Sequence, residues 1–148
     1  MVERYWVGTA AGVRRFFIMG HGSARGGRSR YLSPFPRLAG IDCPERKQPW
    51  GQRAKQALSD YVFNQQVTVD WDKLDRYKRV VGKVLDGHRD VNLALVRDGM
   101  CWWYRKYARE QSPVDQRLYE AAEAKAKEER EGLWVDPEPV PPWDWRRR

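Results

Sequence analysis

The stretch Arg37-Leu-Ala-Gly-Ile-Asp42-Cys-Pro-Glu45 is the part of the sequence that decides the fold. The small and apolar residues from Leu38 to Ile41 predict a short buried strand, which Asp42-Cys-Pro ends. A second charged stretch, Asp75-Arg-Tyr-Lys-Arg79, leads into a further strand predicted over Arg79 to Leu85. Both stretches place charged side chains where a strand meets a loop, and among these are two arginines, Arg37 and Arg79, and two carboxylates, Asp42 and Glu45.

These side chains are the ones that hydrolysis of a phosphodiester requires. A carboxylate accepts the proton of an attacking water or holds that water in line. Guanidinium groups bind the charge of the five-coordinate phosphorus through paired hydrogen bonds, more strongly in the transition state than in the ground state. The two motifs therefore predict cleavage of nucleic acids.

Composition also indicates a polyanionic partner. The chain has 148 residues, enough for one domain with a modest core, and a net charge of +8 with an isoelectric point near 9.7. No apolar run approaches the roughly 20 residues of a membrane-spanning helix. The run Phe16-Phe-Ile-Met19 is shorter than the roughly 7–15 apolar residues of a signal peptide. We expect a monomer without membrane contact, and the sequence as written favours the cytoplasm.

Changes in composition divide the chain into three segments. Residues 1–36 are rich in arginine and glycine, and the stretch from His21 to Arg30 predicts a mobile loop or arm. Residues 37–135 carry the regular patterns, and residues 136–148 form a proline-rich basic tail that we expect to be extended and solvated. The two cysteines, Cys43 and Cys101, make neither a disulfide framework nor a zinc motif, and their pairing stays open.

Residue periodicity and turn signals predict the remaining elements and an α+β fold with a small barrel. The predictions are strands over 5–7, 13–19 and 67–71, a helix over roughly 50–64, a short helix from Asp90 closed by Gly99, a strand or extended segment over 101–107, and a helix from Ser112-Pro113 to Gly132 with Leu118, Ala121, Ala122 and Lys125 on one face.

From about Arg37 to Trp145 the chain resembles the staphylococcal-nuclease-like (thermonuclease) family. Besides the two charged stretches, the resemblance rests on Gln48-Pro-Trp-Gly-Gln-Arg-Ala-Lys55, Asp90-Val-Asn92, Leu95-Val-Arg-Asp-Gly99, Gly132-Leu-Trp134 and Pro141-Pro-Trp-Asp-Trp145. It implies a mainly β member of the α+β class, a five-stranded OB-type barrel with about three flanking helices. It also implies a calcium-dependent endonuclease that acts on DNA and RNA with low sequence specificity. The family is often secreted, which leaves the localisation open.

The resemblance implies a catalytic set and a metal site. Arg37 and Arg79 would contact the scissile phosphate, and Glu45 would be the general base or would orient the water. Asp42 would ligate calcium through its carboxylate and Cys43 through its backbone carbonyl, because calcium takes oxygen ligands in loose geometry.

Two tyrosines are candidates for substrate binding. The resemblance implies that Tyr77 lies near the nucleotide and that Asp75 braces the loop around it. Tyr107 follows an aromatic run and is our candidate for stacking on a base, although aromatic residues at this spacing also form cores.

The chain departs from the family pattern in two places. It has no aspartate before Asp42, where the family has an Asp-Gly-Asp-Thr turn, so we expect weaker calcium binding. Residues 1–36 are open to three interpretations. They are a divergent arm that still supplies two strands, or a misread or frameshifted start, or a sign that the protein has lost catalysis and is a catalytically impaired OB-type nucleic-acid-binding module. Lys78 replaces a glycine of the family, which matters if the backbone φ there is positive.

Overall fold

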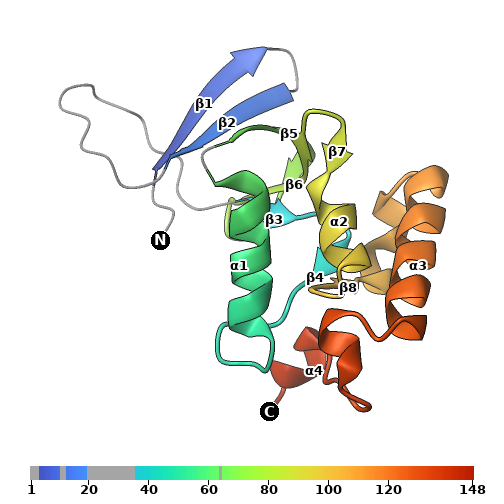
Figure 1. Ribbon diagram of the computed structural model, residues 1–148. Coiled ribbons are helices and arrows are strands. Elements are labelled where there is room, and N and C mark those ends of the chain that lie inside the picture. Colours follow the sequence, from blue (N-terminus) through green and yellow to red (C-terminus); the bar gives the residue numbers. More distant parts are fainter. Residues whose placement is uncertain (1–3, 11–12, 20–35, 64) are drawn as a thin grey trace. The chain divides into compact units, whose positions relative to one another are not determined.

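A computed structural model describes residues 4–10, 13–19, 36–63 and 65–148 (Figure 1). The elements are β1 (Arg4–Ala10), β2 (Val13–Met19), β3 (Arg37–Leu38), β4 (Ile41–Asp42), α1 (Gly51–Val62), β5 (Gln66–Leu74), β6 (Val80–Asp86), β7 (Arg89–Asp90), α2 (Val91–Arg97), β8 (Trp102–Trp103), the 3-10 helix η1 (Arg105–Glu110), α3 (Pro113–Glu128), the 3-10 helix η2 (Gly132–Val135) and α4 (Pro142–Trp145). The predicted arm from His21 to Arg30 lies outside the described residues.

Contacts divide the chain into two units, residues 1–39 with 59–91 and residues 40–58 with 92–148. The first unit contains a sheet in the order β1-β2-β5-β6-β3, with β7 paired to β6. All pairs are antiparallel except β3 with β6. Val67, Val69 and Val84 are buried on alternating strand positions, as the sequence pattern predicts for half-buried strands. The strands predicted over 5–7, 13–19 and 67–71 are confirmed.

The α+β class is also confirmed, with several strands in a sheet, as in an OB-like fold, and three main helices, α1, α2 and α3. Closure into a barrel is not seen, because the pairings in the described part of the chain leave β1 and β3 at the ends of the strand order. Within that same part, no helix is both long and apolar enough to cross a membrane.

The second unit is built around the short β4–β8 pair, in which Ile41 lies opposite Trp103 and Asp42 opposite Trp102. Directly beside this pair a disulfide joins Cys43 to Cys101, which answers the question that the sequence left open. Leu95, Tyr119 and Leu133 are among the fully buried side chains of this unit. The turn after β4 is therefore held by a covalent link as well as by backbone pairing.

Two predicted extended segments are wrong. Only Trp102–Trp103 of the segment 101–107 is a strand, and the chain then turns into η1. The reason is that Gly40, which falls opposite Tyr104 in this register, has φ 74° and belongs to a turn, so β4 begins only at Ile41 and β8 has no strand partner beyond Trp103. The tail is likewise not wholly extended, because Pro142 opens a helical turn, α4.

Helix α3 begins as predicted but buries a different face. Ser112 caps it by accepting a hydrogen bond from the Asp115 backbone N–H at 3.0 Å. The helix ends at Glu128, before Gly132, which has φ 54° and opens η2. Its buried residues are Tyr119, Glu123 and Ala126, whereas Leu118 from the predicted face is 48% exposed.

The buried carboxylate of Glu123 explains this choice of face. Its Oε1 accepts the backbone N–H of Trp103 at 3.2 Å, and its Oε2 lies 2.8 Å from Arg105 Nη1 and 3.1 Å from Lys127 Nζ. The side chain is only 1% exposed, so burial would be costly without these partners. Glu123 thereby joins α3 to β8 and η1.

We predict that Glu123→Gln lowers the free energy of unfolding by about 2 kcal/mol, because the amide nitrogen that replaces a carboxylate oxygen cannot accept hydrogen bonds from Arg105 and Lys127. Urea unfolding followed by tryptophan fluorescence measures this change. Glu120→Gln, at an exposed position of the same helix, is the control and should stay within about 0.5 kcal/mol of the wild type. Equal stabilities of the two variants would contradict the role of Glu123.

Candidate active site

Asp42 ends β4, and Glu45 lies in the turn that follows it, before α1, in the second unit. The backbone N–H of Glu45 donates to Gln48 Oε1 at 3.0 Å, and the carbonyl of Glu45 accepts from the Gln48 backbone N–H at 2.8 Å. A Cβ on Gly51 would collide with the Glu45 carbonyl, so α1 starts directly against the turn. The backbone that carries Glu45 is therefore fixed, while its side chain remains 44% exposed.

The guanidinium of Arg146, from the end of the tail, binds both carboxylates. Arg146 Nη2 donates to Asp42 Oδ2 at 2.6 Å, and Nη1 donates to Asp42 Oδ1 at 3.2 Å and to Glu45 Oε1 at 2.7 Å. The hydrogen bond to Asp42, followed by the one to Glu45, raises the pKa of Arg146 above its ordinary value, although partial burial opposes the shift. The two carboxylates thus converge on a single cationic group.

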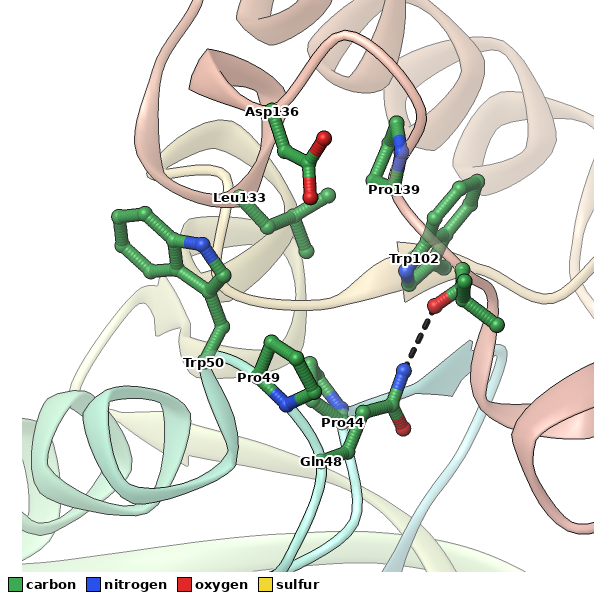
Figure 2. A pocket seen from close by; sticks show the side chains of 9 residues that line it. Pro44, Gln48, Pro49, Trp50, Trp102, Leu133, Asp136 and Pro139 are labelled. Carbon is green, nitrogen blue, oxygen red and sulfur yellow. Dashed lines mark hydrogen bonds between the residues drawn. The ribbon is translucent and has the colours of Figure 1, made fainter.

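The tail that carries Arg146 is packed rather than solvated, contrary to our prediction. Gln48 Nε2 donates to the carbonyl of Val140 at 2.6 Å, as Figure 2 shows. Pro142 is buried, and the Trp143 ring stacks on Tyr104 with centroids 5.1 Å apart. Gln48 therefore contacts the backbone of the Glu45 turn and the backbone of the tail with one side chain.

A pocket lies where this tail passes the turn and the start of α1 (Figure 2). Its lining residues come from the turn, from β8 and from the segment before α4; they are Pro44, Gln48, Pro49, Trp50, Trp102, Leu133, Asp136, Pro139 and Val140. Three of them are prolines, which have little backbone freedom to lose on folding. The walls of the pocket therefore have little conformational freedom. They consist of the tail and the residues on which the tail packs.

The predicted arginines lie in the first unit. Arg37 is in β3 and lies opposite Val81 of β6, while Arg79 directly precedes β6. Because β3 and β6 run parallel, both arginines lie at the same end of this strand pair. Arg79 Nε donates to Asp75 Oδ2 at 2.7 Å, which orients its guanidinium.

Asp75 braces the loop before β6, as predicted. Its Oδ1 accepts the backbone N–H of Tyr77 at 2.8 Å and that of Arg79 at 2.9 Å. Burial of Asp75 acts to raise the pKa of its carboxyl, but the hydrogen bonds from Arg79 and Tyr77 outweigh it and lower that pKa. Lys78 has φ 60°, so the glycine that it replaces would relieve strain in the left-handed region.

We predict that Asp75→Asn lowers the free energy of unfolding at neutral pH and that the difference from the wild type disappears in acid. Because the pKa of Asp75 is lower in the folded state, its ionised carboxylate stabilises the fold at pH values above the ordinary pKa of 3.8. This stabilisation is lost as the pH falls below 3.8. Urea unfolding over a pH series measures it, with the exposed Asp70→Asn as the control. A difference that is independent of pH would contradict the prediction.

The two candidate tyrosines differ in exposure. Tyr77 is 64% exposed, and the guanidinium carbons of Arg76 and Arg79 lie 4.8 and 5.4 Å from its ring centroid. Tyr107 is half-buried and meets the ring of Tyr104 edge-on, with centroids 5.0 Å apart. Tyr77 is therefore the more accessible surface for a base, beside two cations.

The predicted residues thus form two groups, one in each unit: Arg37, Tyr77 and Arg79 in the first, and Asp42, Cys43, Glu45 and Tyr107 in the second. The sequence did not reveal Arg146 or Gln48 as parts of the second group. The signal for Gln48 is that its family landmark begins three residues after Glu45. Nothing in the triple arginine at 146–148 distinguishes its first member.

The carboxylates fit a hard divalent cation in kind but supply few ligands. Three oxygens of Asp42 and Glu45 already converge on one positive group, and oxygen is the donor that calcium prefers. Among residues 36–63 and 65–148 no cluster of three or more His, Cys, Asp or Glu side chains could hold a metal ion. Water and substrate oxygens would have to complete the coordination shell.

Comparison with known proteins defines the class of protein to which this fold and site belong. The sequence pattern described as staphylococcal nuclease homologue matches residues 36–136. A micrococcal nuclease of Shigella flexneri is 41% identical over 120 residues, 75% of this chain and 67% of that protein. Protein ParB of Escherichia coli is 43% identical over 120 residues, covering 75% and 66% of the two chains.

A plant relative is similar over the same share of this chain. A probable staphylococcal-like nuclease, CAN1, of Oryza sativa subsp. japonica is 38% identical over 112 residues, 75% of this chain and 32% of that protein. The chain spans about two thirds of the length of the two bacterial relatives and about a third of the plant protein. The chain belongs to the staphylococcal nuclease homologue family.

Proposed function

We propose that this chain is a nuclease that hydrolyses phosphodiester bonds of DNA and RNA with little sequence preference, as a monomer and with the help of calcium. The observation that carries the proposal is the family match over residues 36–136, a span that contains Arg37, Asp42, Glu45 and Arg79. The bacterial relative named micrococcal nuclease supports the same activity. The net charge of +8 supports a polyanionic substrate.

In this proposal Arg37 and Arg79 bind the scissile phosphate. Both sit at one end of the β3–β6 pair, so the strands fix the separation of their backbones. The phosphate contact of Arg79 is assigned to its two Nη groups, because Nε already donates to Asp75. Paired N–H groups held in advance stabilise the charge that develops on the phosphate oxygens.

Glu45 accepts the proton of the attacking water. Its backbone is held on both sides by Gln48, while its side chain is exposed enough to meet water. A fixed backbone limits the positions that the carboxylate can take, which is what proton transfer at hydrogen-bond distance needs. Tyr77 stacks on a base of the substrate beside Arg76 and Arg79.

Calcium, where bound, would be held by the carboxylate of Asp42 and the backbone carbonyl of Cys43 and would act as a Lewis acid on a phosphate oxygen. The disulfide to Cys101 leaves that carbonyl chemically unchanged and restrains its position. The same disulfide favours an oxidising compartment as the place of action over the cytoplasm.

Cleavage of fluorogenic DNA and RNA by the purified protein, with calcium and with chelator, tests the proposal. We expect cleavage of both substrates that stops when calcium is removed. Salt-sensitive retention of nucleic acid without cleavage would instead support the impaired binding module.

We predict that Glu45→Gln lowers kcat about 100-fold or more, since a general base contributes roughly 10²–10⁴ to the rate. Glutamine keeps the volume and can still accept a hydrogen bond from Arg146, so folding and nucleic-acid affinity should persist. Steady-state kinetics with a single-stranded substrate measure the effect, and Glu128→Gln on the exposed side of α3 is the control. Full turnover by a folded Glu45→Gln protein would remove Glu45 from the mechanism.

We predict that Arg37→Lys and Arg79→Lys each lose most of the activity while nucleic-acid affinity falls little. Lysine keeps the positive charge but cannot offer paired N–H groups to one phosphate. Cleavage rates and filter-binding affinities are compared with those of Arg117→Lys, an exposed arginine of α3. If lysine supports the wild-type rate at either position, charge alone is sufficient there and the bidentate contact is not used.

A further inference from the structure

We propose that Arg146 is a built-in competitor for the cation site. Its guanidinium neutralises Asp42 and Glu45 when no divalent cation is bound, and a divalent cation must displace it to reach Asp42. The inference rests on the proposed function only in assuming that a divalent cation binds at Asp42, beside Glu45.

The guanidinium of Arg146 occupies oxygens of both carboxylates. Nη1 of Arg146 lies 3.2 Å from Asp42 Oδ1 and 2.7 Å from Glu45 Oε1, so one nitrogen sits between two carboxylates. Nη2 takes the remaining oxygen of Asp42 at 2.6 Å. A cation held by Asp42 needs the carboxylate oxygens that Arg146 already occupies, and two positive groups cannot share them without strong repulsion.

The tail is anchored by residues other than Arg146. Gln48 holds the tail at Val140, Pro142 is buried, and Trp143 is stacked on Tyr104. These contacts bring Arg146 to the turn although it lies 104 residues from Asp42 along the chain. The Arg146 side chain itself is 41% exposed, so its guanidinium can swing into water while the anchor of the tail stays in place.

The neighbouring Arg147 differs from Arg146 in its exposure and in its partner. The Arg147 side chain is 79% exposed, and its Nη1 lies 3.5 Å from Asp144 Oδ1 within the tail. It has the same charge as Arg146 and is one residue further along the chain. Arg147→Gln therefore changes the net charge of the protein by the same amount as Arg146→Gln and serves as a matched control.

Calorimetric titration of calcium into the full chain without nucleic acid tests the inference. Removal of a unit charge in contact with the site should tighten calcium binding about tenfold or more in Arg146→Gln. Arg147→Gln should change the affinity less than about threefold, because its charge is solvated and screened. Arg146→Lys should stay close to the wild type, since it keeps the competing charge. Equal or weaker binding by Arg146→Gln than by the wild type overturns the proposal.

Thermal unfolding separates competition from a merely structural role. In chelator, Arg146→Gln should have a lower Tm than the wild type, because Asp42 and Glu45 then repel each other. In saturating calcium most of this difference should disappear, since the bound cation replaces the guanidinium. A Tm deficit of the same size in both conditions, or no calcium binding by either protein, overturns the proposal. Cleavage measured in parallel judges the nuclease function separately, because calcium affinity can change in a protein that cleaves nothing.

Discussion

The buried carboxylate of Glu123 is the interaction on which the second unit depends. It accepts the backbone N–H of Trp103 and pairs with Arg105 and Lys127, so it fixes β8 against α3. Strand β4 is only two residues long and pairs with β8, and the Cys43–Cys101 disulfide adds a covalent link beside that pair. The position of the turn after β4 therefore derives from a carboxylate on a helix far along the chain. A two-residue strand alone would hold that turn weakly.

The turn and the tail are also tied to each other. Gln48 accepts from the backbone of Glu45 and donates to the backbone of Val140, and it is only 6% exposed. Each polar group of its amide that is withdrawn from water thus finds a partner, which is why a buried glutamine is tolerated here. Because one amide serves both segments, a shift of the tail also changes the support of the turn that carries Glu45.

Local patterns could be predicted from the sequence, and distant charge pairs could not. Buried Ala54 and Val62 recur at helical spacing, Val67 and Val69 alternate, and Ser112 is a helix cap, so α1, β5 and the start of α3 were predictable. The buried face of α3 was not predictable, because it contains Glu123, and a hydrophobic periodicity assigns a charged residue to the solvent-exposed side. Arg146 was missed because its partners are more than 100 residues away, and nothing local distinguishes it from Arg147. The proposed catalytic residues were predicted from their family spacing, whereas the contacts that Gln48 and Arg146 make with the Glu45 turn were not predicted.

The extent of the site therefore differs from the extent of the family match. The match ends at residue 136, yet the guanidinium that binds both carboxylates lies at residue 146. Three successive arginines have equal charge, but in the contacts that the structure describes Arg146, at the C-cap of α4, binds the carboxylates, while Arg147 pairs with Asp144. Position at the end of a short helix thus selects the interacting residue, and net charge does not. A chain ending at the family boundary would keep Asp42 and Glu45 and lose the group that neutralises them, so the tail has to be counted as part of the site.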